Sequence, residues 1–112
     1  MKLVEYKSHQ NTTKIMGGTP YIKWRDGMLC VAHRHTWDTG VKYRYYAHQF
    51  IHKIGDSVKH SDLFYIITKH MEFITSIHRL DDNILVLSLG VNDNKTAIVK
   101  VDISNIVFHT LE

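Results

Sequence analysis

Cysteine and proline each occur once in the 112 residues of the chain, as Cys30 and Pro20. A single cysteine excludes an intrachain disulfide and a zinc site built from several cysteines. Because Cys30 lies within an apolar segment, we expect a buried and unreactive thiol. Proline cannot donate a ladder hydrogen bond, so Pro20 fits only the start of a strand or an edge strand.

Long hydrophobic runs and clusters of one charge are also missing. No apolar segment approaches the length that spans a membrane, and residues 1–5 lack the apolar stretch of a signal peptide. The formal charge is +3, and the lysines and arginines are scattered along the chain, which makes nucleic acid an improbable partner. The sequence therefore predicts a protein without a membrane segment, in a reducing cytoplasmic compartment.

Short apolar segments separated by turn residues dominate what is present. Hydrophobic residues make up 44% of the chain, and no segment carries a sustained 3.6-residue apolar stripe. Asp26-Gly27 is a strong hairpin-turn signal, because both residues accept a positive φ. We therefore predict one all-β domain over residues 1–112, built from antiparallel sheets.

The strand pattern occurs twice. Residues 26–31 are echoed by residues 82–87, and each copy is flanked by further apolar segments. An antiparallel repeat of about 50 residues is typical of β-propeller blades. We predict one blade-like repeat over residues 15–68 and a second over residues 69–107. Two blades do not close a ring, so the pattern predicts a propeller fragment completed by copies of itself or by a partner chain. A compact barrel or sandwich is the alternative.

Nine histidines are a high number for this length. His33 and His35 are two residues apart on a predicted strand, so their side chains leave on one face and have a spacing that can chelate a metal. Asp38 follows them as in the first motif of a cupin, but the chain lacks a matching second motif. The simpler interpretation of His35 is a partly exposed polar residue at the end of a strand.

Four short strings, in order, resemble one family. They are Gly17-Gly18-Thr19-Pro20 with Trp24, Gly27, Leu29 and His33; Tyr45-Tyr46-Ala47-His48-Gln49-Phe50; Met71-Glu72-Phe73; and Gly90-Val91-Asn92-Asp93 with Ala97. Together they resemble the C-terminal part of the five-bladed propellers of glycoside hydrolase family 130, the β-mannoside phosphorylases and hydrolases. They are also similar to propeller segments found beside glycosyltransferase modules. The resemblance covers residues 15–107.

The resemblance implies a ligand pocket on the propeller axis. His33 matches a histidine that helps to hold phosphate in the phosphorylases, Glu72 matches the glutamate of an Ile-Glu-Phe string, and Asp93 matches an acidic turn residue at the pocket. Arg44 and Tyr46, on the neighbouring strand, are implied as further ligand-binding residues. In this family the proton donor and the phosphate clamp lie in earlier blades, which have no counterpart here.

The remaining aromatic residues divide into core and surface candidates. Trp37 lies in a polar segment and is our candidate for a platform that stacks on a sugar. Core packing is the favoured interpretation of the others, which are Trp24, Tyr43, Tyr45, Tyr46 and Phe50.

Three functions follow as expectations. The first is a carbohydrate-related propeller fragment that binds a sugar or phosphate, or serves a structural role, without independent catalysis. The second is a phosphorylase- or hydrolase-like enzyme completed by self-assembly. The third is a cupin-like metal-binding protein. The favoured first function needs neither a metal nor another cofactor.

Overall fold

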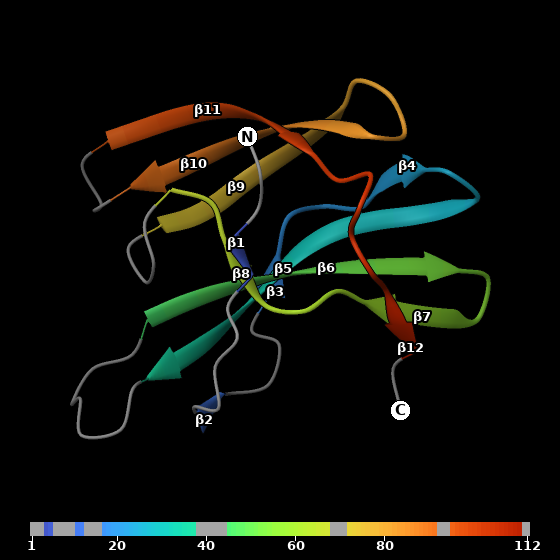
Figure 1. Ribbon diagram of the computed structural model, residues 1–112, viewed down its shortest axis with the longest axis horizontal. Helices are drawn as coiled ribbons and strands as arrows, with labels where there is room; N and C mark the ends of the chain where they lie inside the picture. Colours follow the sequence, from blue (N-terminus) through green and yellow to red (C-terminus); the bar gives the residue numbers. More distant parts are fainter. Residues whose placement is uncertain are drawn as a thin grey trace.

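The chain folds into two antiparallel sheets that pack face to face (Figure 1). The computed structural model describes residues 4–5, 11–12, 17–37, 45–67, 72–91 and 95–110, and it describes side chains for residues 17–34, 47–67, 72–91 and 95–110. The predicted all-β antiparallel class is confirmed. Within these ranges no helix is long and apolar enough to cross a membrane.

Among the described residues the larger sheet has nine strands, and an antiparallel meander of four forms its centre. The meander runs through β4 (Ile22–Trp24), β5 (Gly27–Trp37), β6 (Tyr45–Ile54) and β7 (Ser57–His60). Five two-residue strands extend it: β1 (Val4–Glu5), β2 (Asn11–Thr12), β3 (Gly17–Gly18), β8 (Phe64–Tyr65) and β12 (His109–Thr110).

The smaller sheet is a second meander, in the order β9–β10–β11. Its strands are β9 (Glu72–Arg79), β10 (Ile84–Val91) and β11 (Lys95–Asp102). Burial alternates strictly along β10, so every second side chain enters the core and the others are partly exposed. This period of two is expected for a strand whose two faces meet different environments. The boundary predicted between residues 68 and 69 lies outside the described residues, between β8 and β9.

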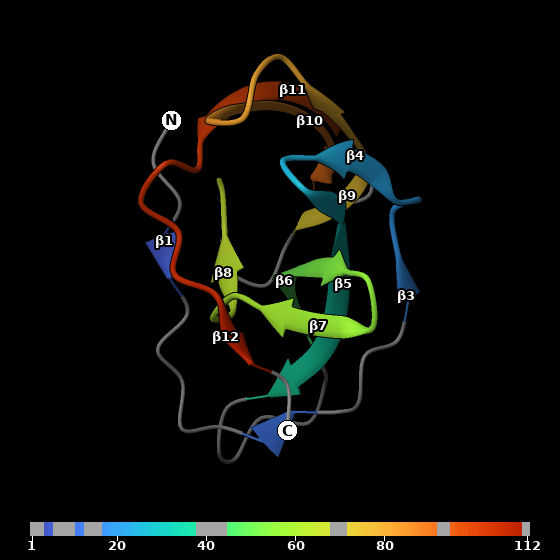
Figure 2. The same cartoon turned by 90° about the vertical axis from the view of Figure 1, so that its right-hand side faces the viewer.

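One hydrophobic core fills the space between the sheets, and Figure 2 shows the smaller sheet lying across the larger one. Its buried members are Trp24, Leu29, Val31, Phe50, Phe64, Ile66, Ile74, Ile77, Leu85, Leu87, Leu89, Val91, Val101 and Ile103. The predicted burial of Trp24 and Phe50 is confirmed. The indole N–H of Trp24 donates to the carbonyl of Asp82 at 3.0 Å, so the buried polar group is satisfied across the two sheets.

Residues 29–32 of β5 are buried on both faces, which is typical of a strand segment with a continuous apolar sequence. Leu29 and Val31 enter the main core, whereas Cys30 and Ala32 pack on the opposite face against Ile51. The expected burial of Cys30 is confirmed, and this burial raises the pKa of its thiol, which favours the protonated form.

The first hairpin turn is displaced by one residue from the predicted position. Arg25 and Asp26 form the turn, and Gly27 already belongs to β5 and pairs with Trp24. Arg25 supplies the positive φ, at 53°. Glycine is required at position 27 for a different reason, because a Cβ there would collide with the carbonyl oxygen of Lys53 on β6.

The C-terminal segment returns to the larger sheet. After β11 the chain turns at residues 104–105. It then runs back so that β12 pairs with β7, with His109 opposite His60. Strands from both ends of the chain, β1 and β12, therefore lie in the same sheet.

Candidate functional site

Two of the predicted site residues, His33 and Glu72, come together at one end of the core. The ring of His33 on β5 lies 5.0 Å from the ring of Phe73 on β9, the residue next to Glu72. Directly opposite His33 in the sheet is His48 on β6. Its Nε2 atom lies 3.6 Å from Oε2 of Glu72. We call His33, His48, Glu72 and Phe73 the histidine–carboxylate cluster.

Strand register places three members of the cluster, His33, His48 and Glu72, on the core faces of their strands. Directly paired residues of an antiparallel sheet point to the same face, and that face alternates along each strand. His33 therefore shares the core face of β5 with Leu29 and Val31, and His48 shares the core face of β6 with Phe50. From the other sheet, Glu72 enters opposite Val91 at the start of β9.

Glu72 is buried, with 1% of its surface exposed. Its Oε1 atom accepts hydrogen bonds from the backbone N–H groups of Ile66 at 2.6 Å and Ile67 at 3.0 Å. Burial by itself would raise the pKa of Glu72, but His48 and the two N–H donors outweigh it, so the pKa is lowered. The carboxylate therefore stays ionised near neutral pH and fixes the backbone that follows β8.

His48 is equally buried and packs against Phe64, with ring centroids 5.7 Å apart. Among the residues described, neither of its ring nitrogens has a partner within hydrogen-bond distance. Its Nε2 contact with Glu72 is longer than a hydrogen bond and is therefore mainly electrostatic. The contact with Glu72 can orient the imidazole of His48. A ligand outside the core would instead contact His33 and Phe73, which are partly exposed.

The other predicted site residues are placed in part or not at all. Trp37 lies at the end of β5 opposite Asn11, and Tyr46 lies on β6 opposite His35, while the side chains of Trp37 and Tyr46 lie outside the described part. Arg44 and Asp93 also lie outside it. Ligand-binding roles for these four residues stay predictions.

The cupin-like alternative gains no support from the placed residues. Asp38 and the side chain of His35 lie outside the described part. Among the side chains that are described, no group of three or more histidine, cysteine, aspartate or glutamate residues is arranged to hold a metal ion.

His48 is the member of the cluster that the sequence did not single out. It lies within the Tyr45–Phe50 string, where the aromatic residues were the more obvious feature. The signal that identifies it is its pairing with His33, which follows from the register of β5 against β6. Register between strands depends on the turn and on core packing, so it cannot be read from a single strand.

No protein-family model matches the chain, and no curated protein or solved structure matches it. The function must therefore be argued from the residues and from their geometry.

Proposed function

We propose that the chain is a carbohydrate-related, propeller-like module of the cytoplasm that binds a sugar or phosphate without independent catalysis. The binding site is the exposed side of the histidine–carboxylate cluster. One observation carries the proposal. His33 and Glu72 lie far apart in the sequence and both match site residues of the family that the chain resembles. In the structure they are linked by the contact of His33 with Phe73 and by the contact of Glu72 with His48, which pairs with His33.

The cluster divides into a supporting part and a contacting part. Glu72 and His48 are buried and hold the strand ends in place. His33 and Phe73 are partly exposed and lie edge to face, with an angle of 63° between their rings. A histidine offers a hydrogen bond to a hydroxyl or phosphate oxygen, and an aromatic ring offers an apolar surface to the C–H face of a sugar.

Binding is favoured over cleavage by the chemistry of the carboxylates. Glycoside hydrolysis usually requires two carboxyl groups that flank the scissile bond. Glu72 is the one buried carboxylate among the described residues, and its Oε1 is already engaged by backbone N–H groups. An enzyme completed by a second copy of the chain is the competing hypothesis.

Calorimetric titration tests the proposal with mannose, mannose 1-phosphate and a β-mannobiose. We expect the wild type to bind at least one of them, and His33→Ala to weaken binding about tenfold or more, which corresponds to about 1.4 kcal/mol. His78→Ala is the matched control, because His78 is exposed on β9 and lies outside the cluster. Equal binding by wild type and His33→Ala would overturn the proposed site.

Turnover is measured on the same samples, with and without phosphate. We expect no release of sugar or sugar phosphate from β-mannosides at any protein concentration. Release that rises with self-association would replace the binding function by the enzyme hypothesis.

The propeller form of the proposal includes self-association with further copies. Ile98 on β11, which is 75% exposed, is an apolar side chain of the smaller sheet that such a contact could cover. Light scattering during size-exclusion chromatography should give a discrete dimer or trimer of the 13.1 kDa chain. A monomer would remove the assembled ring and leave the binding site of a single chain to be tested as above.

A further inference from the structure

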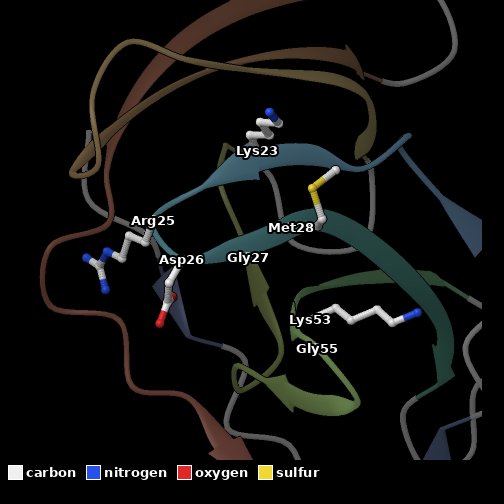
Figure 3. Close-up of a pocket in the computed structure, with 7 residues that line it drawn as sticks. All are labelled: Lys23, Arg25, Asp26, Gly27, Met28, Lys53 and Gly55. Carbon is white, nitrogen blue, oxygen red and sulfur yellow. The ribbon is translucent and has the colours of Figure 1, made fainter.

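A basic groove lies on the face of the larger sheet that points away from the core. Its volume is about 480 Å³, and its walls are the turn between β4 and β5, the turn between β6 and β7, and the side chains of Lys23, Met28 and Lys53 (Figure 3). All three side chains are exposed. The groove is separate from the histidine–carboxylate cluster, which faces the core on the other side of the sheet.

Strand pairing places the two lysines on either side of Met28. Lys23 on β4 pairs with Met28 on β5, and Met28 pairs with Lys53 on β6. Directly paired residues share a face, and Leu29, the neighbour of Met28, points into the core. The row Lys23–Met28–Lys53 therefore presents two ammonium groups beside an apolar thioether.

Tyr21, two residues before Lys23, extends the same face of the sheet. Its phenol lies near the side chain of Cys30, which lies on the same face, two residues along β5 from Met28. Tyr21 remains 47% exposed. An exposed tyrosine ring next to lysines combines a stacking surface with a cationic site.

The charges of the groove are unbalanced. Arg25 is held at the turn, with its guanidinium 4.1 Å above the Trp24 ring. Asp26 lies 3.8 Å from Nε2 of His52, and in Figure 3 the side chains of Arg25 and Asp26 point away from Lys53. Within the described part of the chain, neither Lys23 nor Lys53 takes part in an ion pair. The side chains that line the groove comprise three cations and one carboxylate, so the lining carries a net charge of +2.

We propose that this groove binds the phosphoryl group of a phosphorylated sugar, with Lys23 and Lys53 on the phosphate and Tyr21 beside the sugar ring. A phosphate monoester carries a charge of about −1.5 to −2 at neutral pH, which matches the net charge of the groove lining, whereas a carboxylate would neutralise only part of it. This second site goes beyond the proposed function, and neither site requires the other.

Amide chemical shifts in an NMR titration test the proposal with three probes: glucose 6-phosphate, inorganic phosphate and glucose. We expect both phosphates to shift the amides of Lys23, Met28 and Lys53, and glucose to leave them unchanged. Raising sodium chloride from about 50 to about 300 mM should weaken binding, because salt screens exposed charges. Shifts of equal size with glucose, or no shifts in the groove, would overturn the proposal.

Variants identify the groups that bind. The double variant Lys23→Gln, Lys53→Gln should lower the affinity for both phosphate probes about tenfold or more, which is about 1.4 kcal/mol. Lys95→Gln is the matched control, because Lys95 is exposed on β11 in the other sheet. Unchanged affinity of the double variant would exclude the two lysines as the phosphate ligands.

Tyr21→Ala separates a sugar phosphate from free phosphate. We expect this variant to bind glucose 6-phosphate more weakly and to bind inorganic phosphate with unchanged affinity. Equal effects on the two affinities would show that Tyr21 does not contact the sugar. His33→Ala should leave all groove shifts intact. The two sites can therefore fail independently, and the measurement shows which one has failed.

Discussion

Replacing Glu72 tests whether its buried carboxylate holds the end of the core together. In Glu72→Ala, the N–H groups of Ile66 and Ile67 lose their acceptor. Each buried N–H left without a partner costs about 1–3 kcal/mol. For the two groups together we therefore expect a loss of about 2–6 kcal/mol.

Glu72→Gln separates charge from shape. The amide oxygen can still accept from the same two N–H groups, but it carries no charge. Hydrogen bonds to an ionised group are worth about 1.5–3 kcal/mol, against about 1 kcal/mol for neutral ones. We expect glutamine to destabilise the protein by about 1–2 kcal/mol, clearly less than alanine.

Urea unfolding, followed by the fluorescence of the buried Trp24, measures both variants. With an m-value of about 1–3 kcal/mol per molar urea, glutamine should lower the midpoint by about 1 M and alanine by about twice as much. Asp56→Asn in the exposed turn between β6 and β7 is the control, and should stay within about 0.5 kcal/mol of the wild type.

Acidification gives a second and independent signature. The pKa of Glu72 is lowered in the folded chain, so its stabilisation is complete above the unfolded pKa of about 4.3 and is lost as the pH falls through the folded pKa. Glutamine has no such proton to take up, so the gap between wild type and Glu72→Gln should close on acidification. A gap that is constant with pH, or an alanine variant within about 0.5 kcal/mol of wild type, would refute this account of Glu72.

Two further substitutions test the close contacts of the fold, and both are measured by urea unfolding. Gly18→Ala should cost about 1–3 kcal/mol, because a Cβ there would meet the backbone of Val31 and Ala32. Gly90→Ala, whose Cβ would have its nearest contact at 4.0 Å, should cost much less, and equal losses would contradict the predicted clash. Leu87→Ala should cost about 2–5 kcal/mol, because Leu87 is fully buried. Ile98→Ala should change the free energy of unfolding by no more than about 0.5 kcal/mol. Similar losses for Leu87→Ala and Ile98→Ala would show that Leu87 does not lie in the core.

The local pattern of the sequence determined the class of fold. Short apolar segments with turn signals between them predicted antiparallel strands. Within β10, buried Leu85, Leu87 and Leu89 alternate with partly exposed residues, which is the period of a strand. The continuous apolar run of β5 likewise predicted burial on both of its faces. These features depend on neighbouring residues within one strand, so they can be predicted from the sequence without a structure.

Tertiary structure decided which residues meet. Glu72 faces His48, and the lysines of β4 and β6 flank Met28, because of strand register and the packing of one sheet on the other. The pairing of β12 with β7 joins residues from distant parts of the chain in the same way. The sequence alone determined an all-β chain of antiparallel strands. Contacts between strands are set by the lowest free energy of the whole core, so only the folded chain decided how the candidate sites are built.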